Sequence, residues 1–403
     1  MASFVEVKPQ RDIDRDFVVS STGKVLALSI SRKRQYISSV VDKDNRTVRH
    51  VHAWLRYLSS SIGTSMTESS VMAYGRGISY FCDWLERSNR YPNLSLDQAL
   101  EVVNRQDILD YHTSTSCSSS TKHHREAIIK ECLTFLATHE GNKVRDLENS
   151  PWGRTDELGY VVKKGNKKSP KIITTEHIIR LLKHMHNECE RCMFHTQYDT
   201  GLRISELIDL RISELPTESI SKDQSFEFLP LYIRGSKGRA TGQKDRITLI
   251  SRATLNRIRK YHQTPEYKLA PSWKVNDPNK PAFLTANQKP WSSRNASKQF
   301  KSAVLRSLLN EDFKTHWVRH GTAFSVLTSD IAKDYADKLL TVKQMFGHSN
   351  ISTTEIYTQL DPTMLANFTK SAKKTNRLDE AEQIRQATYL APLKHKEKRG
   401  HRG

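Results

Sequence analysis

A short stretch near the C-terminus combines a guanidinium, imidazoles and a phenol. His316 and Arg319 stand three residues apart, so they share one face if Thr315 caps a helix. His348 and Tyr357 follow, nine residues apart, with a turn rich in Ser, Asn and Thr between them. A guanidinium can hold a phosphate, an imidazole can accept a proton, and a phenolate can attack phosphorus. The stretch therefore suits a site that binds a phosphate and attacks it with a tyrosine.

A second arginine lies upstream, at the start of a predicted helix. Arg203 follows a Thr-Gly turn, and apolar residues recur after it at helical spacing (Ile204, Leu207, Ile208). Burial of that apolar face fixes the backbone at Arg203, and a rigidly mounted guanidinium can donate two parallel hydrogen bonds to a phosphate. Glu206 lies one turn after Arg203, and we expect it to orient its neighbours rather than to act as a base.

The chain carries three motifs in order: TGLRISEL around Arg203, HWVRH around Arg319, and GHSNISTTEIY ending at Tyr357. They resemble the tyrosine recombinases, the phage integrase family, over about Ile172 to Leu360. This resemblance implies a mainly α fold with a small β-sheet in the C-terminal domain, built as a two-domain, C-shaped clamp. It also implies a catalytic set made of Arg203, Lys237, His316, Arg319, His348 and Tyr357.

In the chemistry that this resemblance implies, the two arginines clamp the scissile phosphate. Tyr357 attacks it and forms a covalent 3′-phosphotyrosyl intermediate. His316 is the best candidate to accept the phenol proton, and His348 binds the phosphate or assists His316. We expect no metal, ATP or other cofactor, because the covalent bond preserves the energy of the phosphodiester.

The expected proton donor to the leaving 5′-oxygen is a lysine on a hairpin. Two strand-like segments flank a Gly- and Lys-rich turn between Phe228 and Leu249. Lys237 lies at the position that matches the family's catalytic lysine, and Lys244 is the second candidate. The alternative is that both lysines only contact DNA phosphates.

Two details depart from the family pattern. The spacing from Arg319 to His348 is a few residues longer than usual, and Phe346 replaces the customary leucine before Gly-His. Neither changes a catalytic residue type.

One cluster resembles a metal site. It comprises His184, His186, Cys189, Cys192 and His195. A single Cys-x-x-Cys in a probable helix is a weak zinc signal, and an odd number of cysteines, here five, implies free thiols. We therefore expect no metal site.

The charge of the chain indicates a nucleic-acid partner. Its 64 Lys and Arg residues exceed its 44 Asp and Glu residues, for a net charge of +20. It has no apolar run long enough to span a membrane and no signal peptide pattern. We therefore expect a cytoplasmic, nucleoid-associated protein of a bacterium, phage or mobile element, with no membrane partner.

The sequence predicts four regions. Residues 1–45 form an N-terminal extension with a small hairpin at 17–19 and 25–28, either an accessory DNA-binding module or a strap on the next domain. Residues 46–142 carry apolar stripes typical of a four- or five-helix bundle, which resembles the family's SAM-like core-binding domain. Residues 143–171 are predicted to be an extended basic linker. Residues 172–403 form the catalytic domain, with a C-terminal helix and a basic tail.

Several basic residues of the bundle are candidates for DNA contact. We place Arg46 and Arg49 on its first helix, and Lys122, His124 and Arg125 at the start of its last helix, after a run of Ser and Thr. Hydroxyls and cations at a helix N-terminus suit phosphate contacts. An ordinary solvated face is the alternative.

The favoured function is site-specific DNA recombination of integrase or transposase type, by a tetramer on two double-stranded DNA sites. Accessory DNA-bending or directionality proteins are further partners that the family allows. Leu365 and Phe368 are candidates for contact with a neighbouring protomer. The alternatives are a type IB-like topoisomerase and a non-catalytic DNA-binding regulator on the same fold.

Overall fold

The structure is a computed structural model. It describes residues 2–7, 17–19, 25–27, 37–60, 66–165, 171–217, 227–234, 245–274, 277–309, 313–329, 334–347 and 376–391. Two compact units divide at residues Lys167 and Lys168. Both are mainly helical with small antiparallel sheets, which confirms the predicted fold class. Among the described helices, none is long and apolar enough to cross a membrane.

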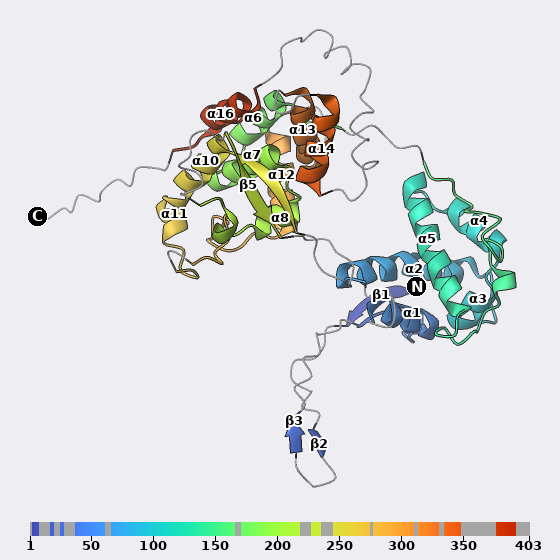
Figure 1. The fold of residues 1–403 in the computed structure, drawn as a ribbon. Coiled ribbons are helices and arrows are strands. Elements are labelled where there is room, and N and C mark those ends of the chain that lie inside the picture. Colours follow the sequence, from blue (N-terminus) through green and yellow to red (C-terminus); the bar gives the residue numbers. More distant parts are fainter. Residues whose placement is uncertain are drawn as a thin grey trace, which may run out of the picture. The chain divides into compact units, whose positions relative to one another are not determined.

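The first unit is a helical bundle (Figure 1). Its described helices are α1 (Arg49–Ser59), α2 (Glu68–Ser88), α3 (Leu96–Val102), α4 (Arg105–Ser114), α5 (Ser119–Leu136) and the short 3-10 helix η1 (Leu147–Asn149). The predicted apolar stripes form its core: Val51 and Leu55 on α1, Ile78 on α2 and Cys132 on α5 are each at most 1% exposed. Periodic burial of this kind is what makes these segments helical.

Part of the N-terminal extension packs against this bundle, which is the strap that we considered as an alternative. Strand β1 (Ser3–Val7) pairs antiparallel with β4 (Ile37–Val41), which leads into α1. Phe4 of β1 packs over α2, where a Cβ on Gly75 would lie 2.3 Å from its ring. The predicted hairpin is also present, as β2 (Phe17–Val19) paired with β3 (Val25–Ala27).

The segment after the bundle is not the extended linker that we predicted from residue 143 onward. Trp152 is fully buried in the core of the first unit. Its Nε1–H donates to Glu126 at 2.8 Å, and the backbone N–H groups of Val161 and Val162 donate to the same carboxylate at 2.6 and 2.9 Å. A buried carboxylate with three donors holds this segment against α5, although the segment lacks a helical period.

In the second unit, helices pack around a two-stranded sheet. Strand β5 (Phe228–Ile233) pairs antiparallel with β6 (Arg246–Ser251), which confirms the predicted pair of strands; Phe228 lies opposite Ser251. The described helices are α6 (Thr175–Lys183), α7 (Glu188–Thr200), α8 (Ile204–Asp209), η2 (Ile212–Glu214), α10 (Arg252–His262), α11 (Pro265–Lys268), α12 (Ser293–Arg306), α13 (Thr315–Thr328), α14 (Tyr335–Phe346) and α16 (Arg377–Thr388).

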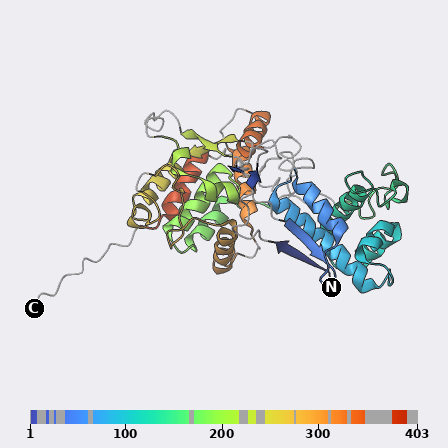
Figure 2. The same ribbon diagram turned by 90° about the horizontal axis from the view of Figure 1, so that it is seen from below.

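The last described helix packs on its own chain. Helix α16 lies against α6, α7 and α10 (Figures 1 and 2). Ile384 is fully buried in the core of the second unit, and Glu380 accepts a hydrogen bond from the Tyr198 hydroxyl at 2.9 Å. The predicted protomer contacts, Leu365 and Phe368, lie outside the described residues.

Candidate active site

Arg203 is mounted at the N-terminus of α8, as predicted. The turn before it needs glycine, because Gly201 has φ +67° and a Cβ there would lie 2.3 Å from the Phe346 ring. The Arg203 backbone N–H donates to Glu206 Oε2 at 2.8 Å, and its Nη1 donates to Glu206 Oε1 at 2.7 Å. The side chain of Arg203 remains 26% exposed, so it is partly accessible to solvent.

The carboxylate of Glu206 lies close to three guanidiniums. The residue is 3% exposed. Its Oε2 also accepts from Arg246 Nη2 at 2.7 Å and lies 4.0 Å from Arg319 Nη1. Burial by itself raises the pKa of Glu206, but the nearby Arg246 and Arg203 guanidiniums outweigh it and hold the pKa below its ordinary value. An ionised carboxylate with these partners suits an orienting role rather than that of a base.

Arg319 lies deeper, on α13. It is 1% exposed. Its Nη1 donates to the Gly201 carbonyl, and its Nη2 donates to the Phe346 carbonyl at 2.7 Å. Its guanidinium carbon lies 3.9 Å from the centre of the Phe346 ring. The phenylalanine that replaces the customary leucine therefore stacks against this arginine. The prediction that Thr315 caps this helix is wrong by one residue: α13 begins at Thr315, and Lys314 occupies the N-cap position without a side-chain cap hydrogen bond.

His316 is exposed on α13, one turn before Arg319. Its ring meets the ring of His320 edge-on, with the ring centres 4.6 Å apart. The same helix thus carries an exposed imidazole and a buried guanidinium three residues apart.

Four of the predicted site residues lie outside the described residues: Lys237, Lys244, His348 and Tyr357. Of the described residues that flank them, Arg246 bonds to Glu206 and the Phe346 carbonyl accepts from Arg319. The two strands that carry the lysine turn are β5 and β6, and α14 ends one residue before Gly347, which precedes His348.

One charged member of the site was missed from the sequence. Arg246 stands at the start of β6 with its side chain 7% exposed, bonded to Glu206 and to the Met345 carbonyl. In the sequence it is one of several basic residues beside the hairpin turn, and no local pattern separates it from the others.

Comparison with known proteins decides the family. Residues 171–364 match the model of the phage integrase family. The chain belongs to this family, the tyrosine recombinases. It is 24% identical over 307 residues to tyrosine recombinase XerD of Rickettsia bellii, covering 73% of this recombinase and 90% of XerD. It is 30% identical over 207 residues to tyrosine recombinase XerC of Escherichia coli O157:H7, covering 50% of this recombinase and 60% of XerC.

Solved structures of low sequence identity share the fold of the recombinase. XerH bound to a palindromic difH substrate matches with a TM-score of 0.54 at 16% identity, over 80% of this chain and 88% of XerH. A lambda integrase dimer bound to a COC′ core site matches with a TM-score of 0.53 at 15% identity, over 77% and 78% of the two chains.

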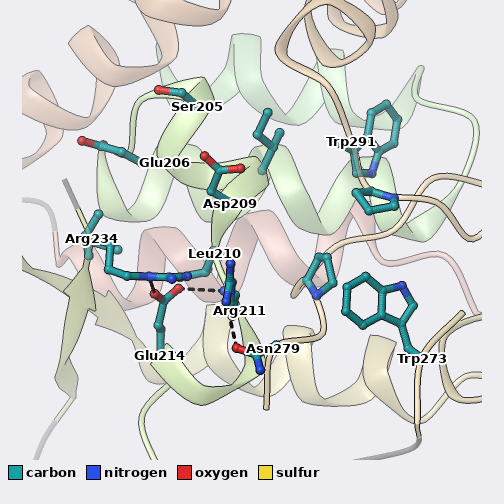
Figure 3. Close-up of a pocket in the computed structure, with 14 residues that line it drawn as sticks. Ser205, Glu206, Asp209, Leu210, Arg211, Glu214, Arg234, Trp273, Asn279 and Trp291 are labelled. Carbon is teal, nitrogen blue, oxygen red and sulfur yellow. Dashed lines mark hydrogen bonds and ion pairs between the residues drawn. The ribbon is translucent and has the colours of Figure 1, made fainter. Parts of the chain in front are cut away.

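A cleft of about 600 Å³ lies beside α8 of the recombinase (Figure 3). Trp273 and Trp291 lie on one side, and on the other side Arg211 bonds to Asn279 at 2.8 Å while Arg234 pairs with Glu214. Its carboxylates (Glu206, Asp209, Glu214) outnumber its guanidiniums (Arg211, Arg234).

The DNA-contact candidates of the first unit fall into two groups. Arg46, Arg49 and His124 are exposed, but Arg46 lies in the turn before α1 and not on that helix as predicted. The reason is that β4 ends at Val41 and the chain must turn before the helix starts. Lys122 and Arg125 contact their own unit: Lys122 Nζ donates to His112 O at 2.5 Å, and Arg125 lies 4.2 Å over the Tyr80 ring.

The predicted Cys and His cluster is divided: Cys189, Cys192 and His195 are buried on α7, whereas His184 and His186 precede that helix and are exposed. Cys189 and Cys192 lie in the core of the second unit, and burial raises the pKa of the Cys189 thiol to about 12. Within the described ranges, no group of three or more His, Cys, Asp or Glu side chains could hold a metal ion.

Proposed function

We propose that the recombinase cuts and rejoins DNA strands at specific sites through a covalent bond between Tyr357 and a DNA 3′-phosphate. The observation that carries this proposal is the convergence of Arg203 and Arg319, from α8 and α13, on the single carboxylate of Glu206. Two guanidiniums held at one point supply the positive charge that a phosphoryl-transfer transition state needs.

The catalytic roles follow from the residue types. Arg203, the more exposed arginine, binds the scissile phosphate directly, and Arg319 adds charge from beneath. His316 accepts the proton of the Tyr357 hydroxyl, and His348 assists it. Lys237, or Lys244 in its place, donates a proton to the leaving 5′-oxygen. The free 5′-hydroxyl of a second strand then attacks the phosphotyrosine and reseals the backbone, which requires no cofactor.

The substrate and assembly are inferred from the relatives. The similar XerH structure holds its difH DNA substrate after cleavage, and a lambda integrase tetramer is bound to a Holliday junction. The Tn1549 transposon integrase is in complex with circular intermediate DNA. We infer that this recombinase acts on double-stranded DNA sites as a tetramer, in the cytoplasm where that DNA lies, with accessory DNA-bending or directionality proteins as further partners.

The test is to trap the covalent intermediate and sequence the DNA attached to it. Nicked fragments of the source genome are incubated with the recombinase, so that the short strand beyond the cut diffuses away and resealing fails. We expect a denaturation-resistant adduct with the wild type and none with Tyr357→Phe, with the attached 3′ ends clustered at one sequence. Adducts at scattered sequences would support the topoisomerase alternative, and their absence from the wild type would support the regulator.

A further inference from the structure

Two guanidiniums meet the C-terminal end of α14. Arg246 Nη1 donates to the carbonyl of Met345, and Arg319 Nη2 donates to the carbonyl of Phe346 at 2.7 Å. The last carbonyls of a helix lack donors within the helix and carry the negative end of its dipole, so cations stabilise them. The end of α14 is therefore fixed by Arg246 together with the proposed catalytic Arg319.

The other nitrogen of Arg246 reaches the proposed phosphate site. Its Nη2 donates to Glu206 Oε2 at 2.7 Å, on the oxygen that also accepts the Arg203 backbone N–H. Through that carboxylate, Arg246 is connected to the arginine that is partly accessible to solvent. The side chain of Arg246 is only 7% exposed, so Arg246 suits a supporting role more than direct contact with a substrate.

The backbone of the α14 end is adapted to this side chain. Gly347 has φ +62°, and a Cβ there would lie 2.6 Å from Arg246 Cδ. Glycine suits this position, because φ is positive and a Cβ would displace the Arg246 side chain. Arg246 itself is held in β6, opposite Ile233 of β5.

We propose that Arg246 is a positioning residue for strand cleavage, which holds Glu206 and the end of α14 together and so aligns Arg203 and Arg319 on the phosphate. This inference rests on the proposed function. An arginine is required because its planar fork donates to two acceptors in different directions, whereas a lysine offers one nitrogen on a flexible stem. A displacement of about 1 Å in a phosphate-binding group can lower a rate by about a hundredfold.

The experiment uses the full-length recombinase and two suicide substrates made from its mapped site. One carries an ordinary scissile phosphodiester, and the other carries a methylphosphonate, which lacks the negative charge that Arg203 and Arg319 would stabilise. Single-turnover cleavage is measured for the wild type, Arg246→Lys, Arg246→Gln and Arg203→Ala. The matched control is Arg234→Gln, because Arg234 directly follows β5 at the same end of the hairpin but pairs with Glu214.

We expect Arg246→Lys to cleave the phosphodiester about 10- to 100-fold more slowly than the wild type, and Arg246→Gln more slowly still. On the methylphosphonate the deficit of both variants should shrink to a fewfold, as should that of Arg203→Ala. Arg234→Gln should match the wild type on both substrates. Arg246→Lys keeps a cation beside Glu206, so it provides the test even if Arg246→Gln fails to fold, and thermal unfolding of each variant verifies its fold.

The outcomes separate the two proposals. Wild-type cleavage by Arg246→Lys, or an equal loss on both substrates while Arg203→Ala is rescued by the methylphosphonate, would overturn the role of Arg246 and leave the proposed function intact. If Arg203→Ala also shows no preferential loss on the phosphodiester, the proposed arginine clamp is itself wrong, and the role of Arg246 falls with it.

Discussion

Glu206 shows how a single buried carboxylate can organise a phosphate site. It lies among guanidiniums from α8, β6 and α13, and each lies within 4.0 Å of one of its oxygens. A buried charge of this kind is stable only while its partners remain, because an uncompensated charge in the interior is costly. The site therefore depends on Glu206 for structure as well as for alignment.

We expect Glu206→Ala to lower the free energy of unfolding of the second unit by about 3–5 kcal/mol, because it leaves Arg246 buried without its carboxylate. The comparison variant is Glu214→Ala, which removes a pair with the 42% exposed Arg234 and the acceptor of the Arg211 backbone N–H; it should cost less than Glu206→Ala, about 1–2 kcal/mol. Chemical denaturation at neutral pH measures both. Equal losses for the two variants would contradict the prediction.

The same carboxylate should make stability depend on pH. The pKa of Glu206 is lowered in the folded chain from its ordinary value of 4.5, with burial opposing and Arg246 and Arg203 causing the shift. Its stabilising contribution is therefore present above the unfolded pKa and is lost as pH falls through the folded pKa. The difference in unfolding free energy between wild type and Glu206→Gln should be largest near neutral pH and shrink below about pH 4. A difference that grows on acidification would refute this.

At the scale of elements, the site forms where a turn between two helices contacts the end of a third helix. The turn between α7 and α8 contacts the end of α14 through Gly201 and Phe346, and Arg319 of α13 bonds to the carbonyls of both residues. Since each contact is made by a helix terminus or a turn, small changes of residue size at these points should shift one element against another.

Gly201→Ala tests this contact. We expect it to destabilise the chain by about 1–3 kcal/mol, because alanine at φ +67° is strained and its Cβ would meet the Phe346 ring at 2.3 Å. Adding Phe346→Leu, the residue customary at this position in the family, should recover part of the loss by removing the ring. Thermal unfolding of the single and double variants gives the coupling, and strictly additive effects would show that the ring contact is unimportant.

Helix α16 is attached to the second unit by buried polar contacts. Glu380 accepts hydrogen bonds from Thr175, Tyr198 and Ser325. Glu380→Ala should therefore cost about 2–3 kcal/mol in unfolding free energy, because it leaves buried hydroxyls without an acceptor. Glu382→Ala, on the same helix, removes a partly exposed pair with Arg385 and an exposed hydrogen bond from Gln386, and it should cost less than about 1 kcal/mol. Hydrogen exchange of α16 should rise in the first variant and not in the second.

At the scale of the whole molecule, the net charge of +20 points to a large electrostatic contribution to DNA binding. We expect the double variant Arg46→Gln and Arg49→Gln to reduce the slope of log K against log[salt] by about 2, because each exposed arginine releases about one counterion. The control removes Arg87 and Arg154, which are exposed but paired with Asp83 and Glu148. Binding titrations over a range of salt concentrations measure the slopes, and equal changes in the two double variants would argue against a phosphate contact at Arg46 and Arg49.

By itself, the sequence determined the elements and the chemistry that they carry. The apolar periods of α1, α2 and α5, the Arg203 turn and the β5–β6 hairpin are local patterns, because 3.6-residue periodicity and turn residues act over a few positions. The identity of Arg203, His316 and Arg319 as site candidates also came from motifs, which are local.

Only the tertiary structure decided which side chains meet. Arg246 carries no local signal, yet packing brings it from β6 to Glu206 and the end of α14. Trp152 likewise lacks a helical period and is fully buried because a distant carboxylate, Glu126, holds its segment. Buried ion pairs and hydrogen bonds between remote residues depend on the burial that surrounds them, and burial is a property of the folded chain and not of any short stretch of sequence.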